Sequence, residues 1–143
     1  MSPPTQLAYR IGAAARRPAS WWQLFKFGLV GGVGYLINLI VFALLAGLLD
    51  VHHVIAAIAA FCVAVTNNFV LNRHWTFEPG EGPAHFQAAR FFAVSLASLA
   101  LNIAVLELLI SNHWTGELVA QAISVAVAMP FNFLGNKLWT FDQ

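Results

Sequence analysis

The sequence predicts an all-α integral membrane protein with four transmembrane helices, arranged as two tandem two-helix repeats. Three observations favour this class. Of the 143 residues, 59% are hydrophobic and only 9% are charged, whereas soluble domains carry about 25% charged residues. Four long segments contain almost no charge, and a ten-residue pattern occurs twice at an offset of 64 residues. So few charged side chains cannot cover the surface of a soluble domain.

Each of the four apolar segments approaches the length that a helix needs to cross a membrane. They are residues 27–49, 54–72, 91–110 and 118–136, and they contain one charged residue, Glu107. About 20 apolar residues span the hydrocarbon core, and a backbone in lipid must satisfy its own hydrogen bonds, which favours helices. We therefore expect transmembrane helices at roughly 24–49, 53–73, 88–111 and 115–137. Pro130 should kink the last of them.

The repeated pattern closes the second and the fourth apolar segments. Residues 68–77 have the sequence NFVLNRHWTF, and residues 132–141 have the sequence NFLGNKLWTF. The same offset relates three further pairs: Lys26 and Arg90, Phe27 and Phe91, and Asn38 and Asn102. Since this period exceeds that of solenoid repeats, we interpret the chain as a duplication with repeat halves at 24–77 and 88–141.

The positive charges predict how the chain is oriented in the membrane. All seven Lys and Arg residues lie in the N-terminal tail or at the helix ends that border the tail, the loop at 74–89 and the C-terminus. The loops at 50–53 and 111–117 contain none. By the positive-inside rule, both termini and the middle loop are cytoplasmic. We expect a cytoplasmic tail at 1–20, with a short interfacial helix near 7–15, followed by a membrane domain at 21–143.

Little in the sequence supports catalysis. Only Glu107 among the acidic residues lies within a predicted helix, so the helices offer no carboxylate pair for acid–base chemistry. The five histidines lie at helix ends and in loops and show no metal-ligand spacing with the single cysteine. A net charge of +1 gives no basis for a nucleic-acid partner. We expect no catalytic residue, metal or cofactor.

Polar residues gather at the predicted cytoplasmic ends of helices two and four. Asn68, Asn72 and Trp75 share one helix face, because they are spaced by four and three residues. Ordinary membrane anchoring explains Trp and snorkelling cations, but amides in lipid are costly unless paired. Basic pockets at this depth suit phosphate head groups. We predict a lipid-phosphate and sugar site formed by Lys26, Asn68, Asn72, Arg73, Trp75, Arg90, Asn132, Asn136, Lys137 and Trp139.

Three polar residues lie deeper in the predicted helices. Asn38 and Asn102 are near the middle of their segments, and Glu107 is near the outer end of helix three. The two amides either pair with each other or contact a head group in transit. An intramembrane acid is a functional hypothesis by default, although Glu107 is close enough to the surface to reach water. We predict a translocation path along these three residues.

The sequence resembles the GtrA family of small four-helix membrane proteins. The resemblance is carried by residues 26–31, KFGLVG, and by the two copies of N-F-x-x-N-[RK]-x-W-T-F, and it covers roughly 22–141. It implies a flippase that moves a polyprenyl-phosphate-linked sugar, of the undecaprenyl-phosphate glucose type, from the cytoplasmic to the periplasmic leaflet of a bacterial inner membrane. Such a flippase would serve the modification of surface polysaccharides such as O-antigen. The alternatives are a membrane anchor or partner subunit of a polyprenyl-phosphate glycosyltransferase, and a small-molecule exporter.

Assembly is the last expectation. Gly28 and Gly32 form a small-xxx-small pair, which lets another helix approach closely. They either pack against a helix of the same chain or form a seam between two chains. We expect a homo-oligomer, most simply a dimer, because four helices enclose little polar surface around a head group.

Overall fold

The computed structural model describes residues 3–78 and 82–142, and within these ranges every regular element is helical. Residues 79–81 of the predicted cytoplasmic loop lie outside the described residues, as do residues 1–2 of the predicted tail and 143 of the predicted membrane domain. Within the described ranges, four helices are long and apolar enough to cross a membrane: Pro18–Leu48, His53–Thr76, Ala84–Ser111 and Val119–Thr140. The predicted all-α membrane class with four spanning helices is confirmed.

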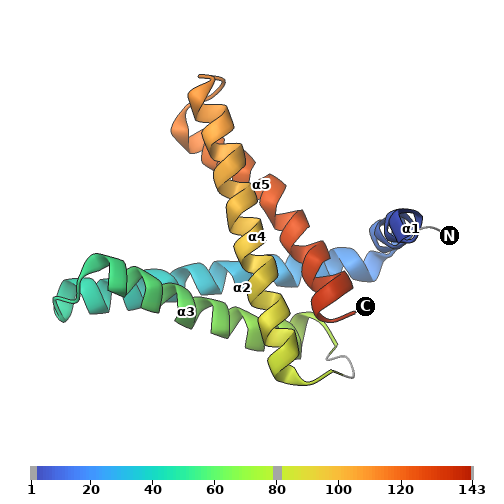
Figure 1. Ribbon diagram of the computed structural model, residues 1–143, viewed down its shortest axis with the longest axis horizontal. Helices are drawn as coiled ribbons and strands as arrows, with labels where there is room; N and C mark the ends of the chain where they lie inside the picture. The colour runs from blue at the N-terminus through green and yellow to red at the C-terminus, as the bar shows by residue number, and fades with distance from the viewer. Residues whose placement is uncertain (1–2, 79–81, 143) are drawn as a thin grey trace. The chain divides into compact units, whose positions relative to one another are not determined.

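The first hairpin consists of two helices that lie side by side and antiparallel (Figure 1). Helix α2 (Pro18–Phe42) continues into the π-helical turn η1 (Ala43–Leu48), and α3 (His53–Leu71) continues into the π-helical turn η2 (Asn72–Thr76). At the tip, Asp50 adopts a left-handed conformation with φ of 50°, which Asp tolerates better than most residues. The ring of His52 then accepts a hydrogen bond from the Val54 N–H at 3.3 Å and caps α3.

The second hairpin follows the same plan. Helix α4 (Ala84–Ser111) lies beside α5 (Glu117–Gly135), and α5 continues into the π-helical turn η3 (Asn136–Thr140). The N-terminal helix α1 (Pro3–Arg16) contacts this hairpin, since Arg10 forms an ion pair with Asp142 at 3.0 Å. Both side chains of that pair are largely exposed, so it adds little stability.

A stripe of small residues lines the inside of each hairpin. Ala56, Ala60 and Ala64 are the buried residues of α3, and they recur every four residues on one helix face. The buried stripe of α5 is Ala120, Ser124 and Ala128, at the same offset of 64 residues. Small side chains let two helix backbones approach closely, so each stripe allows tight pairing with the neighbouring helix.

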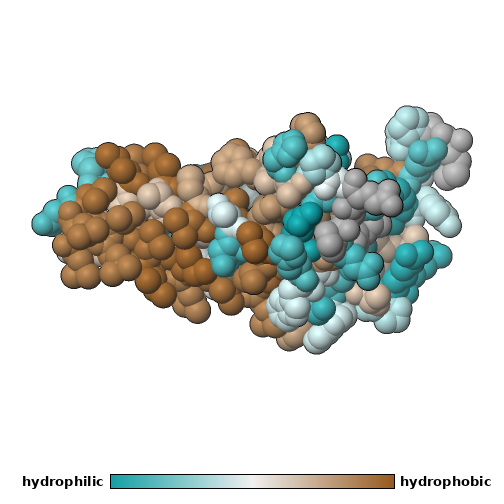
Figure 2. Space-filling view, turned by 90° about the horizontal axis from the view of Figure 1, so that it is seen from below, coloured by the Kyte–Doolittle hydropathy of each residue, from teal (hydrophilic) through white to brown (hydrophobic). Residues whose placement is uncertain are grey.

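Large apolar side chains point outward instead. Leu36, Ile40, Ile55 and Ile58 are all more than half exposed. Figure 2 shows hydrophobic residues over most of the first hairpin, with hydrophilic residues at its tip. Such a surface is unfavourable in water and suits a lipid environment.

At the ends where α2 and α4 begin and η2 and η3 finish, the helices extend beyond the expected boundaries, whereas η1 ends at Leu48 and α5 begins at Glu117, just inside the expected limits of 49 and 115. Helix α2 begins at Pro18, inside the predicted tail, and α4 begins at Ala84. Proline is favoured in the first turn of a helix, where its missing N–H costs nothing. The turns η2 and η3 carry the second and fourth helices on to Thr76 and Thr140. The charge-free runs mark the apolar part of each helix, whereas the helical hydrogen bonds continue into the polar residues beyond it.

Candidate lipid head-group site

The base of the first hairpin is the end where α2 begins and η2 closes. The Phe77 N–H donates to the Asn72 carbonyl at 2.8 Å, an i to i+5 bond that completes the π-helical turn. The last carbonyls of a helix lack helical partners, and that of Trp75 accepts a hydrogen bond from the Lys26 ammonium at 3.2 Å. Lys26 therefore places a cation at the negative end of the helix dipole.

Aromatic rings surround that cation. The Lys26 Nζ lies 5.6 Å from the ring centroid of Trp22 and 5.4 Å from that of Trp75. Both distances fall within the range of cation–π attraction. The Phe27 and Phe77 rings pack with their centroids 6.2 Å apart.

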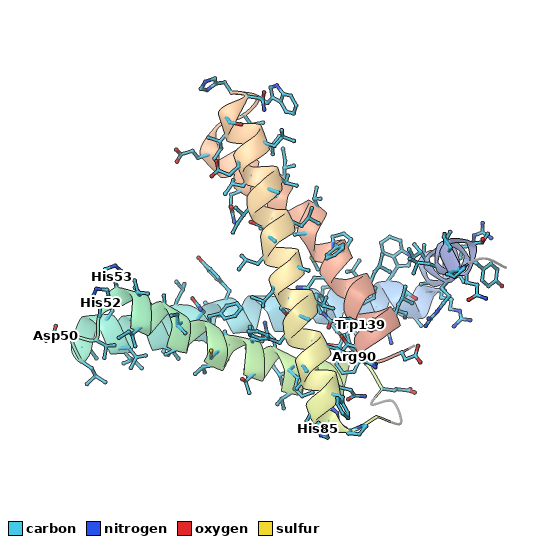
Figure 3. The ribbon with its side chains drawn as sticks, viewed as in Figure 1. Asp50, His52, His53, His85, Arg90 and Trp139 are labelled. Atoms are coloured by element: carbon cyan, nitrogen blue, oxygen red, sulfur yellow. The ribbon has the colours of Figure 1, made fainter. Side chains whose placement is uncertain are left out.

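The base of the second hairpin contains the same set of contacts. The Phe141 N–H donates to the Asn136 carbonyl at 2.9 Å, and Arg90 Nη1 donates to the Trp139 carbonyl at 3.1 Å. Figure 3 shows Arg90 and Trp139 together at this end of the hairpin, with the guanidinium carbon 5.6 Å from the indole centroid. Phe91 packs against Phe141 with a centroid distance of 6.4 Å. Each contact has a partner in the first hairpin 64 residues earlier, which supports the predicted duplication.

A polar column runs along each base. The second polar column consists of Asn132, Asn136 and Thr140, and its side chains hydrogen-bond to one another. Asn136 Nδ2 donates to the Asn132 carbonyl at 3.0 Å and to Asn132 Oδ1 at 2.8 Å. Thr140 Oγ1 donates to Asn136 Oδ1 at 2.9 Å. Asn136 and Thr140 are 0% and 2% exposed, so these bonds satisfy polar groups that water does not reach.

The first polar column consists of Asn68, Asn72 and Thr76, and the corresponding bonds are absent from it. Asn72 and Thr76 are 1% and 3% exposed. Asn68 Oδ1, Asn72 Oδ1 and Thr76 Oγ1 are all buried without a hydrogen-bond partner. The Asn68 amide lies against Gly34 of α2, where a Cβ atom would overlap it. We call the first column open, because buried polar atoms in it lack hydrogen-bond partners, and the second column closed, because its side chains bond to one another.

Two further cations lie in the π-helical turns. Arg73 is half-buried in η2. Lys137 is 8% exposed in η3, and its ammonium lies 5.9 Å from the centroid of the Phe133 ring. The base of each hairpin thus contains two of the predicted cations, two amides and an indole. The predicted site residues of each repeat half lie together in one hairpin, and their role as a site stays a prediction.

The predicted path residues lie farther along the helices. Asn38 in α2 and Asn102 in α4 are half-buried, and Glu107 in α4 is exposed. Their role in translocation stays a prediction. Within 3–78 and 82–142, no three His, Cys, Asp or Glu side chains gather closely enough to hold a metal ion. The groups that do gather, amides, hydroxyls and cations, are suited to binding anions and sugar hydroxyls.

Sequence reasoning left three features out of the site. Thr76 and Thr140 belong to the repeated pattern and complete the polar columns; their position four residues after an Asn was the available signal. Trp22 was not linked to Lys26, although the two are four residues apart in one helix. The ion pair between Arg10 and Asp142 joins residues too distant in sequence for any local pattern to indicate it.

The four apolar helices and their two polar bases define a multi-pass membrane protein. A family model described as GtrA/DPMS, transmembrane domain, matches residues 26–141. The chain therefore belongs to this family, as the resemblance predicted, and the match begins and ends at the bases of the hairpins.

Two similar proteins come from Bacillus subtilis (strain 168). The chain is 30% identical over 120 residues to the uncharacterized membrane protein YngA, which covers 84% of this chain and 80% of that protein. It is 22% identical over 111 residues to the uncharacterized membrane protein YwcD, covering 76% of this chain and 87% of that protein.

Proposed function

We propose that the protein is a flippase that moves a polyprenyl-phosphate-linked sugar, of the undecaprenyl-phosphate glucose type, from the cytoplasmic to the periplasmic leaflet for surface-polysaccharide modification. One observation carries this proposal: both hairpins hold cations, an indole and a polar column at the base of otherwise apolar helices. Moving an unshielded anion through hydrocarbon costs several kcal/mol or more. Paired polar groups beside lipid-facing helices suit a substrate whose tail stays in the bilayer.

The cations supply partners for the lipid phosphate. In this proposal the primary phosphate partners are Arg73 in the first hairpin and Lys137 in the second. Lys26 and Arg90 are the secondary partners. Lys26 and Arg90 each donate one hydrogen bond to a Trp carbonyl. An ammonium has three N–H donors and a guanidinium has five, so both residues retain donors for an anion.

We place the bases of the hairpins on the cytoplasmic side of a bacterial inner membrane. The distribution of the seven cations supports this orientation, and the similar proteins from Bacillus support the bacterial membrane. A reporter fused to the C-terminus should behave as cytoplasmic, and periplasmic activity of that fusion would contradict the orientation. Asn38 in the first hairpin, and Asn102 and Glu107 in the second, are the proposed path residues.

Reconstitution tests the proposed activity directly. Proteoliposomes are loaded with an undecaprenyl-phosphate hexose in one leaflet, and a membrane-impermeant reagent that modifies the hexose reports its sidedness. We expect the protein to equalise the two leaflets without ATP, since the chain has no phosphate-binding loop. Protein-free vesicles are the control. Sidedness that matches these vesicles would overturn the flippase proposal.

The family description favours a second candidate function, because it names DPMS beside GtrA. The resemblance of the sequence implies that such domains also accompany polyprenyl-phosphate glycosyltransferases. In this case the chain would be a non-transporting anchor or partner subunit. Unchanged lipid sidedness, together with co-purification of a membrane glycosyltransferase, would favour the anchor over the flippase.

A further inference from the structure

The two polar columns have matching positions and different hydrogen bonding. The second column, Asn132, Asn136 and Thr140, is closed by its own bonds. The first column, Asn68, Asn72 and Thr76, leaves three buried polar atoms without a partner. Building on the proposed function, we infer that the first column binds hydroxyl groups of the sugar, whereas the second column braces its hairpin and does not contact the sugar.

The physical reason is that unpaired buried polar atoms destabilise a fold. The second hairpin shows that the same Asn-Asn-Thr spacing in the same π-helical turn can satisfy itself. The first hairpin has the same residue types at the same spacing and does not. A partner from outside the hairpin therefore completes the first column.

The hydrogen-bonding capacity of the three unpaired atoms indicates which kind of partner they need. Two of them are amide oxygens, which need a hydrogen-bond donor, and the third is a hydroxyl, which both donates and accepts. An ionised phosphate diester only accepts, so it cannot pair with the amide oxygens. A sugar hydroxyl donates and accepts. Successive column members are about 6 Å apart along the helix, so one hexose ring can engage two neighbours.

Gly34 leaves space beside the first column because it has no side chain. The Asn68 amide occupies the space that a Cβ at residue 34 would fill. In the second hairpin the corresponding residue is Ser98, whose hydroxyl donates to the Ala128 carbonyl at 3.1 Å. A serine thus fills the place that the first hairpin leaves for an amide. Asn72 and Thr76 are almost fully buried, so contact with a sugar requires the base of the first hairpin to open locally.

The test compares two lipids bound by the full-length protein in nanodiscs. The probes are undecaprenyl phosphate with one hexose and undecaprenyl phosphate alone. The readout is the affinity ratio, which is the affinity for the lipid with the hexose divided by the affinity for the lipid without it. We expect Asn72→Leu, which keeps the side-chain shape, to lower this ratio about tenfold, the equivalent of one hydrogen bond. Binding of the lipid without sugar should stay unchanged. The matched variant Asn136→Leu should lower the unfolding temperature, because its amide bonds to Asn132 and Thr140, and should lower the ratio less than Asn72→Leu does.

A second pair of variants alters the column without removing a polar group. Gly34→Ala should push the Asn68 amide out of place and lower the ratio several-fold. Gly32→Ala is the control on the same helix, because no atom lies within 4 Å of the Cβ that it adds. If Asn72→Leu does not fold, the isosteric Thr76→Val replaces it.

The outcomes separate this inference from the proposed function. If Asn72→Leu and Gly34→Ala both leave the affinity ratio unchanged and still bind the lipid, the inference is overturned and the flippase proposal stands. An equal fall in Asn136→Leu overturns the division between the columns. Failure of the wild-type protein to bind either lipid overturns the proposed function, and the inference with it.

Discussion

The bases of the two hairpins share the contacts that end their helices and differ in the hydrogen bonds of their polar columns. In both, a phenylalanine N–H closes a π-helical turn, and a cation from the preceding helix donates to a tryptophan carbonyl. The polar columns beside these contacts are open in the first hairpin and closed in the second. The shared contacts are those that end the second helix of each hairpin.

The difference shows which features the fold does not require. The second hairpin demonstrates that a closed column is compatible with the architecture, so the open column is not a consequence of the fold. Under the proposed function, the two hairpins would divide binding and structural roles between them.

The largest effect is expected from the cations. Each charge-assisted hydrogen bond contributes about 1.5–3 kcal/mol, so Arg73→Ala should weaken binding of a polyprenyl-phosphate hexose about tenfold or more. Lys137→Ala tests the second hairpin in the same way, and the double variant Arg73→Ala, Lys137→Ala tests both hairpins together. Lipid titration into nanodiscs measures each of them. Arg73→Lys should cost less, because it keeps the charge and loses the planar fork.

Comparing the single variants shows whether the hairpins share the phosphate. Equal losses in Arg73→Ala and Lys137→Ala indicate that both contribute, while a loss confined to Arg73→Ala extends the asymmetry from sugar to phosphate. If the double variant inserts normally and binds and moves the lipid at the original rate, these residues are anchors and the site assignment is wrong.

The threonines test the columns through stability. Thr140→Val removes the hydroxyl that donates to the buried Asn136 Oδ1 at 2.9 Å, and an orphaned buried acceptor costs about 1–3 kcal/mol. Thr76→Val removes a hydroxyl that has no partner, so it should be neutral or stabilising. Denaturant unfolding in mild detergent measures both changes. Equal destabilisation by the two variants would show that the first column is closed in the folded protein.

Much of the fold could be predicted from the sequence because the membrane constrains it strongly. Charge-free runs located the four spanning helices, since lipid leaves a backbone few alternatives to a helix. The helix ends were less accurate. Whether a helix continues past the lipid depends on local bonds, such as that from the Phe77 N–H to the Asn72 carbonyl, and composition does not report them. The same limit concealed the π-helical turns.

The candidate site was predicted in outline for a similar reason. The repeated pattern identified Asn72 and Asn136 as equivalent, and their helix spacing placed each beside an indole. The sequence did not indicate that one is hydrogen-bonded and the other is not. That difference depends on side-chain geometry between two helices, where Gly34 faces Asn68 in one hairpin and Ser98 bonds to Ala128 in the other. Orientation in the membrane and oligomeric state stay predictions.

A smaller effect is expected at the point of closest packing in the second hairpin. A Cβ at Gly135 would lie 2.8 Å from Val94 Cγ1, and Val94 is buried and stiff at χ1. Overpacking of this kind costs about 1–3 kcal/mol, partly offset by the gain of about 0.5–1 kcal/mol from replacing a helical glycine with alanine. Gly135→Ala should therefore be mildly destabilising, and Gly32→Ala, which meets open space, mildly stabilising. The opposite order in thermal unfolding would contradict the packing described for Gly135.

The smallest effect concerns the cations that close the two bases. Lys26→Gln and Arg90→Gln each remove a cation from a helix C-terminus, which contributes about 0.3–1 kcal/mol. Lys26 is half-buried between two indole rings, whereas Arg90 is exposed and contacts one. Cation–π attraction is stronger where water is excluded, and salt screens an exposed charge more than a buried one. Lys26→Gln should thus lower the free energy of unfolding more than Arg90→Gln does. Added salt should reduce the effect of Arg90→Gln more than that of Lys26→Gln. Paired unfolding measurements at low and high salt check both statements; a larger cost at Arg90 would mean that the second base depends on its cation more than the first.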